Sequence, residues 1–117
     1  MSLNKFLASA RELKEIDQDM KIVRVTDLSL VSNYTDKKNC AIFDWNYSEQ
    51  NAEKLIQYIK EHLKICPRIE LWNTCDGDNK EAIIKKCSKN ILNIEYIKEI
   101  WGKENVSQPQ CLVVYNS

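Results

Sequence analysis

The chain has 117 residues, of which 44% are hydrophobic and 29% charged, as in an ordinary globular domain. Seventeen basic residues balance seventeen acidic ones, so the chain lacks the excess positive charge that phosphate backbones demand, and we expect no nucleic-acid partner. No apolar run approaches the ~20 residues that span a bilayer, so we expect no membrane partner. The length is that of one domain, so we expect a single domain over residues 1–117.

The first half of the chain predicts one helix and two strands. Apolar residues at helical spacing predict an amphipathic helix over residues 3–16. The β-branched run 21–25 predicts a strand, and the polar run 32–39 predicts a turn or loop. Residues 40–46 predict a central strand, because both of its faces are apolar apart from one carboxylate. One face would carry Ala41, Phe43 and Trp45, and the other Cys40, Ile42 and Asp44.

The clearest helix is predicted over residues 48–64, with Ser48 as its N-cap. Cys66 and Pro67 end it, because the residue before a proline avoids the helical region. Residues 68–74 predict the next strand. A helix between two strands is typical of a βαβ unit, so we expect strands 40–46 and 68–74 to be parallel neighbours.

Residues 79–89 fit two interpretations. Asp78 and Glu81 resemble a capping box, which favours a helix, whereas the lysines suit an edge strand; we favour the strand. A helix then begins after Asn93 and ends with Gly102 at the C′ position, and residues 111–115 predict a buried last strand. The predicted order α-β-β-α-β-(β)-α-β indicates an α+β two-layer sandwich. Its mixed sheet would have four to five strands, with helices mainly on one face.

Five cysteines are scattered, no two of them closer than nine residues, so no zinc knuckle or redox pair is present. An odd number of cysteines favours reduced thiols and a cytoplasmic location. The chain is rich in lysine, isoleucine and asparagine, which AT-rich codons encode, and this favours a bacterial origin.

Two tryptophans lie near the ends of the two strands that we expect to be parallel neighbours. Trp45 and Asn46 end one strand, and Trp72 and Asn73 end the other. With Asp44 they would form a binding surface at one edge of the sheet, since aromatic rings with polar tips suit a pocket or an interface. The alternative is that both tryptophans belong to the core.

The segment from Trp72 to Asp78 contains the weaker candidates for chemistry. Cys75 follows a strand, where catalytic thiols occur, but Asp76 and Asp78 would raise its pKa. The two carboxylates are weak candidates for a metal site, and their spacing does not match an EF-hand. The alternative is a turn in which Gly77 supplies a positive φ. His62, the only histidine, has no visible ligand partner and fits the boundary of a helix.

The chain contains no motif for nucleotides, zinc peptidases or serine hydrolases, so we expect no cofactor. Three segments in the C-terminal half of this chain, RIELWNTCDGD, NIEYIKEIWG and PQCLVVY, together resemble small bacterial proteins, some encoded beside toxins. The resemblance includes no motif with an assigned role. We therefore expect a small non-catalytic interaction protein, regulatory or immunity-type, with a protein partner or a second copy of itself. The alternative is a small-molecule-binding protein or an enzyme that uses Cys75 and Asp44.

Overall fold

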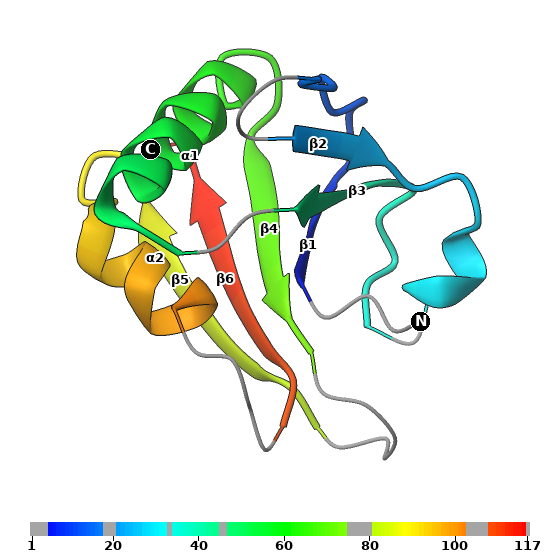
Figure 1. Cartoon of the computed structure of the whole chain (residues 1–117). Helices are drawn as coiled ribbons and strands as arrows, with labels where there is room; N and C mark the ends of the chain where they lie inside the picture. The colour runs from blue at the N-terminus through cyan, green and yellow to red at the C-terminus, as the bar shows by residue number, and fades with distance from the viewer. Residues whose placement is uncertain are drawn as a thin grey trace.

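The computed structural model describes residues 5–17, 21–32, 34–44, 47–74, 81–102 and 108–116 (Figure 1). The elements in chain order are β1 (Lys5–Ser9), β2 (Lys21–Arg24), the 3-10 turn η1 (Leu28–Leu30), β3 (Asn39–Asp44), α1 (Glu49–His62), β4 (Arg68–Asn73), β5 (Ile83–Ser88), α2 (Ile94–Trp101) and β6 (Gln110–Tyr115). The α+β class is therefore confirmed.

All six strands form one sheet in the order β2-β3-β1-β4-β6-β5, so the expected four to five strands were too few. The pairs β2/β3, β3/β1, β1/β4 and β4/β6 are antiparallel, and β5/β6 is parallel. The sheet is therefore mixed, with its one parallel pair at the β5 end.

The predicted helix over residues 3–16 is wrong, because residues 5–9 form the strand β1 in the middle of the sheet. Phe6 and Ala8 point to one face and Leu7 and Ser9 to the other, and all four side chains are at most 1% exposed. A short strand buried on both faces reads as a continuous apolar run, which periodicity does not distinguish from a helix.

Strand β1 also corrects the expected pairing of the two strands that flank α1. Phe6 of β1 lies opposite Ile42 of β3 on one side and opposite Trp72 of β4 on the other. Both outer strands run antiparallel to β1, so β3 and β4 point the same way but are not neighbours. The crossover through α1 therefore passes over one strand.

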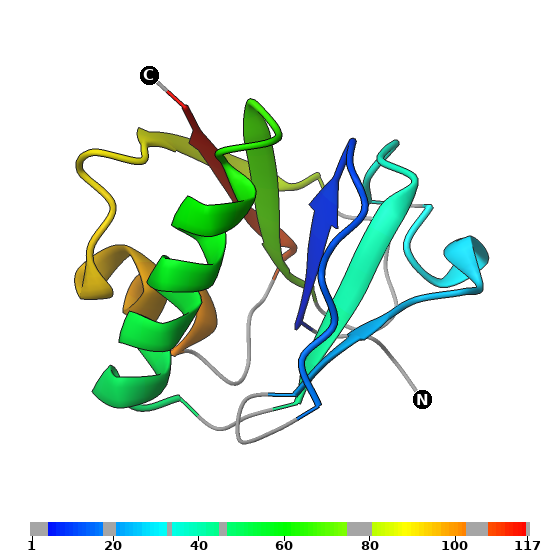
Figure 2. The same ribbon diagram turned by 90° about the horizontal axis from the view of Figure 1, so that it is seen from above.

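Both helices pack on the same face of the sheet, as Figure 2 shows. Ser48 caps α1 as predicted, its Oγ accepting the N–H of Asn51 at 3.1 Å. The apolar stripe of α1 and the buried side of α2 then meet the inward residues of β1, β3, β4 and β6. Phe43 and Trp101 pack edge to face in this core with ring centroids 4.8 Å apart.

The segment 25–37 covers part of the opposite face of the sheet (Figure 2). A turn or loop was predicted over residues 32–39, and residues 26–31 were not assigned to any element. Val31 and the half-buried Leu28 and Tyr34 pack on Phe6 and Trp72. This second apolar cluster lies over β3, β1, β4 and β6. The sheet therefore has a core on both faces near its middle.

The second half of the chain agrees with the preferred predictions. Residues 83–88 form the edge strand β5, and Asn93 caps α2 by accepting the N–H groups of Glu95 and Tyr96. Gly102 ends α2, but with φ −77° as the C-cap rather than at C′ with a positive φ. Glycine fits here because the backbone at residue 102 lies close to the preceding turn, and a Cβ there would lie 2.5 Å from the carbonyl oxygen of Lys98.

Candidate functional site

The residues predicted to form a binding surface at one edge of the sheet are only partly described. Trp45, Asn46 and the side chain of Asp44 lie outside the described residues. Trp72 and Asn73 end β4, and their exposed fractions are 3% and 1%. Lys5 of β1 lies opposite Asn73, so a strand separates the ends of β3 and β4. The sheet thus does not make neighbours of the two strand ends.

Trp72 lies in the apolar cluster opposite the helices. Its ring stacks on Phe6 with centroids 6.0 Å apart and an interplanar angle of 8°, and it is tilted against Tyr34. Its Nε1–H donates to Glu70 Oε1 at 2.8 Å, and the hydroxyl of Thr35 donates to the same oxygen at 2.7 Å. Glu70 therefore ties the segment 25–37 to the sheet through two side-chain donors.

Asn73 belongs to the opposite face and joins the sheet to a helix. Its Nδ2–H donates at 2.8 Å to the carbonyl oxygen of Ile100, near the end of α2. That carbonyl is among those that a helix leaves without an internal partner, so the amide acts as a side-chain cap.

The weaker candidates Cys75, Asp76 and Asp78 all lie outside the described residues. Within the part of the chain that the structure describes, no group of three or more histidine, cysteine, aspartate or glutamate side chains is placed to hold a metal ion. No helix among the same residues is long and apolar enough to cross a membrane.

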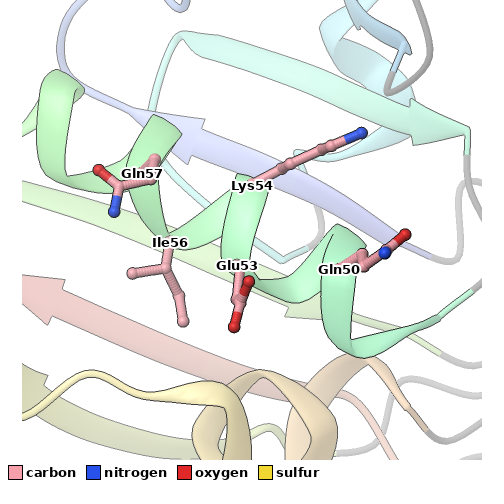
Figure 3. Close-up of a pocket in the computed structure, with 5 residues that line it drawn as sticks. All are labelled: Gln50, Glu53, Lys54, Ile56 and Gln57. Atoms are coloured by element: carbon pink, nitrogen blue, oxygen red, sulfur yellow. The ribbon is translucent and has the colours of Figure 1, made fainter.

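A hollow of about 710 Å³ lies along the outer side of α1. Figure 3 shows its five labelled residues, all from this one helix: Gln50, Glu53, Lys54, Ile56 and Gln57. The side chain of Lys54 points away from those of Glu53 and Ile56, so polar groups diverge here. Ligand pockets bring a few polar groups together, and this surface does not.

Strand β5 is the edge of the sheet and is exposed over most of its length. The N–H groups of Ile83 and Lys89 donate to the carbonyl oxygens of Pro109 and Tyr115, both at 2.9 Å, on the β6 side. Because the N–H groups of successive residues point to alternate sides of a strand, those of Ile84 and Lys86 point to the free edge. A free edge of this kind is a template for another strand.

The sheet face beside this edge also exposes apolar side chains. Ile84 is 56% exposed and lies opposite the buried Cys111 in the register of β5 and β6. Lys86 lies opposite the half-buried Val113, and Tyr115 is 37% exposed at the end of β6. We call the strip of Ile84, Lys86, Val113 and Tyr115 the β5 strip. The described part of the segment 25–37 does not bury it.

The lysines of this region differ in their partners. Lys85 points to the helix face and forms an ion pair with Glu99 of α2. Lys86 belongs to the other face, is exposed, and has no ion-pair partner among the described residues. Lys80 lies outside the described residues. The β5 strip therefore combines apolar surface with one positive charge.

A polar cluster that sequence reasoning missed lies where β1 ends and β4 begins. Ser9 Oγ lies 2.6 Å from His62 Nε2 and 3.4 Å from Cys66 Sγ. The three residues are 1%, 6% and 3% exposed. The spacing of four residues between His62 and Cys66 was the one sequence signal, and Ser9 gave none because β1 was taken for a helix. His62 is thus a buried residue with partners rather than a boundary residue.

A scan against protein-family models, a search of curated proteins and a search of solved structures each found no significant match to this chain.

Proposed function

We propose that the protein is a small interaction module that binds an extended segment of a partner protein as an added strand on β5. The observation that supports this is the edge at Ile84 and Lys86, with which no strand in the described part of the chain pairs, together with the exposed side chains of the β5 strip. Strand addition obtains affinity from main-chain hydrogen bonds and specificity from alternate side chains.

The side chains beside the edge define the partner. Ile84 and Lys86 are two residues apart, so both lie on the same face of the sheet. A strand added next to β5 would place one side chain beside each of them. An apolar residue beside Ile84 and an acidic residue beside Lys86 would bury apolar area and neutralise the free charge. The partner is therefore an extended segment with an apolar and an acidic residue two positions apart.

The same geometry disfavours a second copy as the occupant. Antiparallel self-pairing that uses the whole of β5 sets Lys86 opposite its own copy, or Lys85 opposite its own copy. Like charges directly opposite one another destabilise a sheet. Lysines on edge strands are a known device against such self-association. The four described cysteines are free thiols, which supports a reducing compartment as the setting.

A peptide titration tests the proposal. The probe is the peptide VTETVTET, whose valines and glutamates share one face, and the control peptide VTKTVTKT reverses the charge. The probe should protect the amides of Ile84 and Lys86 from hydrogen exchange in NMR spectra, while the amides of Lys85 and Cys87 already bond to β6 and should change little. Binding should weaken as salt rises, because a lysine–glutamate pair contributes to it.

Two variants of Lys86 and one control sharpen this test. Lys86→Glu should abolish probe binding and favour the lysine peptide, and Lys86→Pro should abolish binding of both because it removes an outward N–H without breaking a bond to β6. Lys54→Glu makes the same charge change on α1 and should bind like the parent protein. Equal binding of the two peptides, or a sedimenting dimer with protected Ile84 and Lys86 amides, overturns the proposal.

A further inference from the structure

Three nucleophilic or basic side chains from distant parts of the chain meet at one end of the sheet. Ser9 ends β1, His62 lies in the last turn of α1, and Cys66 lies in the turn before β4. The serine hydroxyl is the centre of the group, 2.6 Å from His62 Nε2 and 3.4 Å from Cys66 Sγ. The three atoms therefore form a chain that leads from the thiol through the hydroxyl to the imidazole.

Backbone hydrogen bonds hold the members of this chain in place. The N–H of Arg11 donates to Ser9 Oγ at 3.1 Å, and the N–H of Cys66 donates to the carbonyl oxygen of His62 at 3.2 Å. The thiol of Cys66 donates to the carbonyl oxygen of Arg68 at 3.3 Å. Serine, histidine and cysteine thus have fixed positions without any ligand.

The surroundings favour a neutral imidazole and an ionisable thiol. Burial lowers the pKa of His62, so its ring is neutral and able to accept a proton at neutral pH. Burial raises the pKa of Cys66, but hydrogen bonds from Ser9 and from the backbone around it outweigh burial and leave the pKa lowered. Burial raises the pKa of Cys40 to about 11, and it also raises the pKa of Cys87 and Cys111.

We propose that Cys66 is a thiol oxidised by small hydroperoxides, with His62 as the base and Ser9 as the relay between them. The thiol of Cys66 turns its S–H from the carbonyl oxygen of Arg68 to Ser9 Oγ, which lies 3.4 Å away, and passes its proton there while the serine passes its own proton to His62 Nε2. This leaves a thiolate and an imidazolium. The relay needs only this rotation of the S–H bond, because the three heavy atoms are already within 2.6 and 3.4 Å of one another through Ser9.

The chemical step then needs only the hydroperoxide. The thiolate sulfur attacks one peroxide oxygen, so an S–O bond forms as the O–O bond breaks. The departing hydroxide or alkoxide takes the proton from His62 and leaves as water or an alcohol. Sulfur is oxidised by two electrons to the sulfenic acid, and the peroxide is reduced by two. A thiol present in solution restores Cys66 through a mixed disulfide.

The position of the cluster limits the reagent to small molecules. All three side chains are buried, and they line neither the hollow along α1 nor a smaller hollow lined by β5, β6 and α2. Their chain neighbours Arg11 and Pro67 are exposed, so the cluster lies just beneath the surface. Cys40 and Cys111 lie instead in the apolar cluster on the opposite face of the sheet, together with Val31.

The test exposes the intact protein to hydrogen peroxide, traps sulfenic acid with dimedone, and measures the adduct on each cysteine by mass spectrometry. Trypsin places each of the five cysteines on a separate peptide, so the adduct on each cysteine can be measured by itself. The pKa of Cys66 is lowered while burial raises that of Cys40 to about 11, so Cys66 has the larger thiolate fraction at neutral pH, and the lower nucleophilicity of the more acidic thiol offsets only part of this advantage. Cys66 should therefore react at least ~10-fold faster than Cys40.

Two variants separate the relay from simple exposure. Ser9→Ala and His62→Gln should each slow oxidation of Cys66 by at least ~3-fold and shift its pH–rate profile to higher pH, while leaving Cys40 unchanged. Thermal melting verifies that each variant is folded. The proposal is overturned if Cys66 in the parent protein reacts no faster than Cys40, or if a folded variant keeps the parent rate and pH profile. Peptide binding at β5 is a separate measurement, so either proposal can fail alone.

Discussion

Replacement of Trp72 by alanine should destabilise the whole domain. The side chain is only 3% exposed and packs between Phe6 and Tyr34. A buried tryptophan removes ~200 Å² from water, which at ~25 cal/mol per Å² corresponds to ~5 kcal/mol. Neighbouring side chains relax into the space and recover part of this free energy, so we expect a loss of ~4 kcal/mol in the free energy of unfolding.

The conservative variant Trp72→Phe separates packing from hydrogen bonding. Phenylalanine keeps the stacking on Phe6 but loses the N–H that donates to Glu70. Because Glu70 is half-buried and still accepts the hydroxyl of Thr35, the lost bond should cost ~1 kcal/mol. The smaller ring costs about as much again, so the total should be ~2 kcal/mol.

Urea and thermal unfolding followed by circular dichroism measure both variants. At ~2.1 cal/mol/K per residue, the 117-residue chain unfolds with an entropy of ~250 cal/mol/K, so 1 kcal/mol corresponds to ~4 °C in Tm. Trp72→Ala should therefore melt ~16 °C below the parent and Trp72→Phe ~8 °C below. An alanine variant that melts within ~3 °C of the parent would refute the assignment of Trp72 to the core.

Three further predictions concern single contacts. Ser48→Ala removes the oxygen that accepts the Asn51 N–H, and loss of this cap should cost ~1 kcal/mol, or ~4 °C in Tm. Gly102→Ala should lower Tm because its Cβ would meet the Lys98 carbonyl oxygen at 2.5 Å; an unchanged Tm would contradict the close approach. The lowered pKa of His62 means that the folded protein binds this proton less readily than the unfolded chain, so stability should be constant above pH ~6.5 and fall as pH drops below it. Urea midpoints between pH 5 and 8 check this, and His62→Gln should flatten that part of the curve.

Local patterns in the sequence correctly predicted the elements whose apolar residues recur with the period of a helix or a strand. The stripe of α1 and its cap at Ser48 were correct because a helix that covers a sheet buries one side only. The strand predicted over residues 68–74 is also correct, and in β4 Ile69 and Leu71 lie in the apolar cluster under the helices and Trp72 in the opposite one. In both cases the period of the sequence repeats the period of the structure.

The errors come from residues whose neighbours lie far away in the chain. Strand β1 pairs with β3 and β4 along its two edges, and the helices and the segment 25–37 bury its two faces. Residues 5–9 alone carry no signal for these partners. Once β1 was taken for a helix, Ser9 could not be placed beside His62 and Cys66, which are 53 and 57 residues away. Long-range pairing therefore decided both the fold and the polar cluster.

The central position of β1 affects how the chain folds during its synthesis on the ribosome. Its first partner, β3, ends at residue 44, and its second partner, β4, ends at residue 73. Until both have been synthesised, the apolar residues Phe6 and Leu7 have no sheet to complete, and closure must span these long separations at an entropic cost that slows folding. A nascent chain stalled before residue 39 should therefore remain a substrate for chaperones. Deletion of residues 5–9 should split the sheet into the pair β2–β3 and the three strands β4–β6–β5.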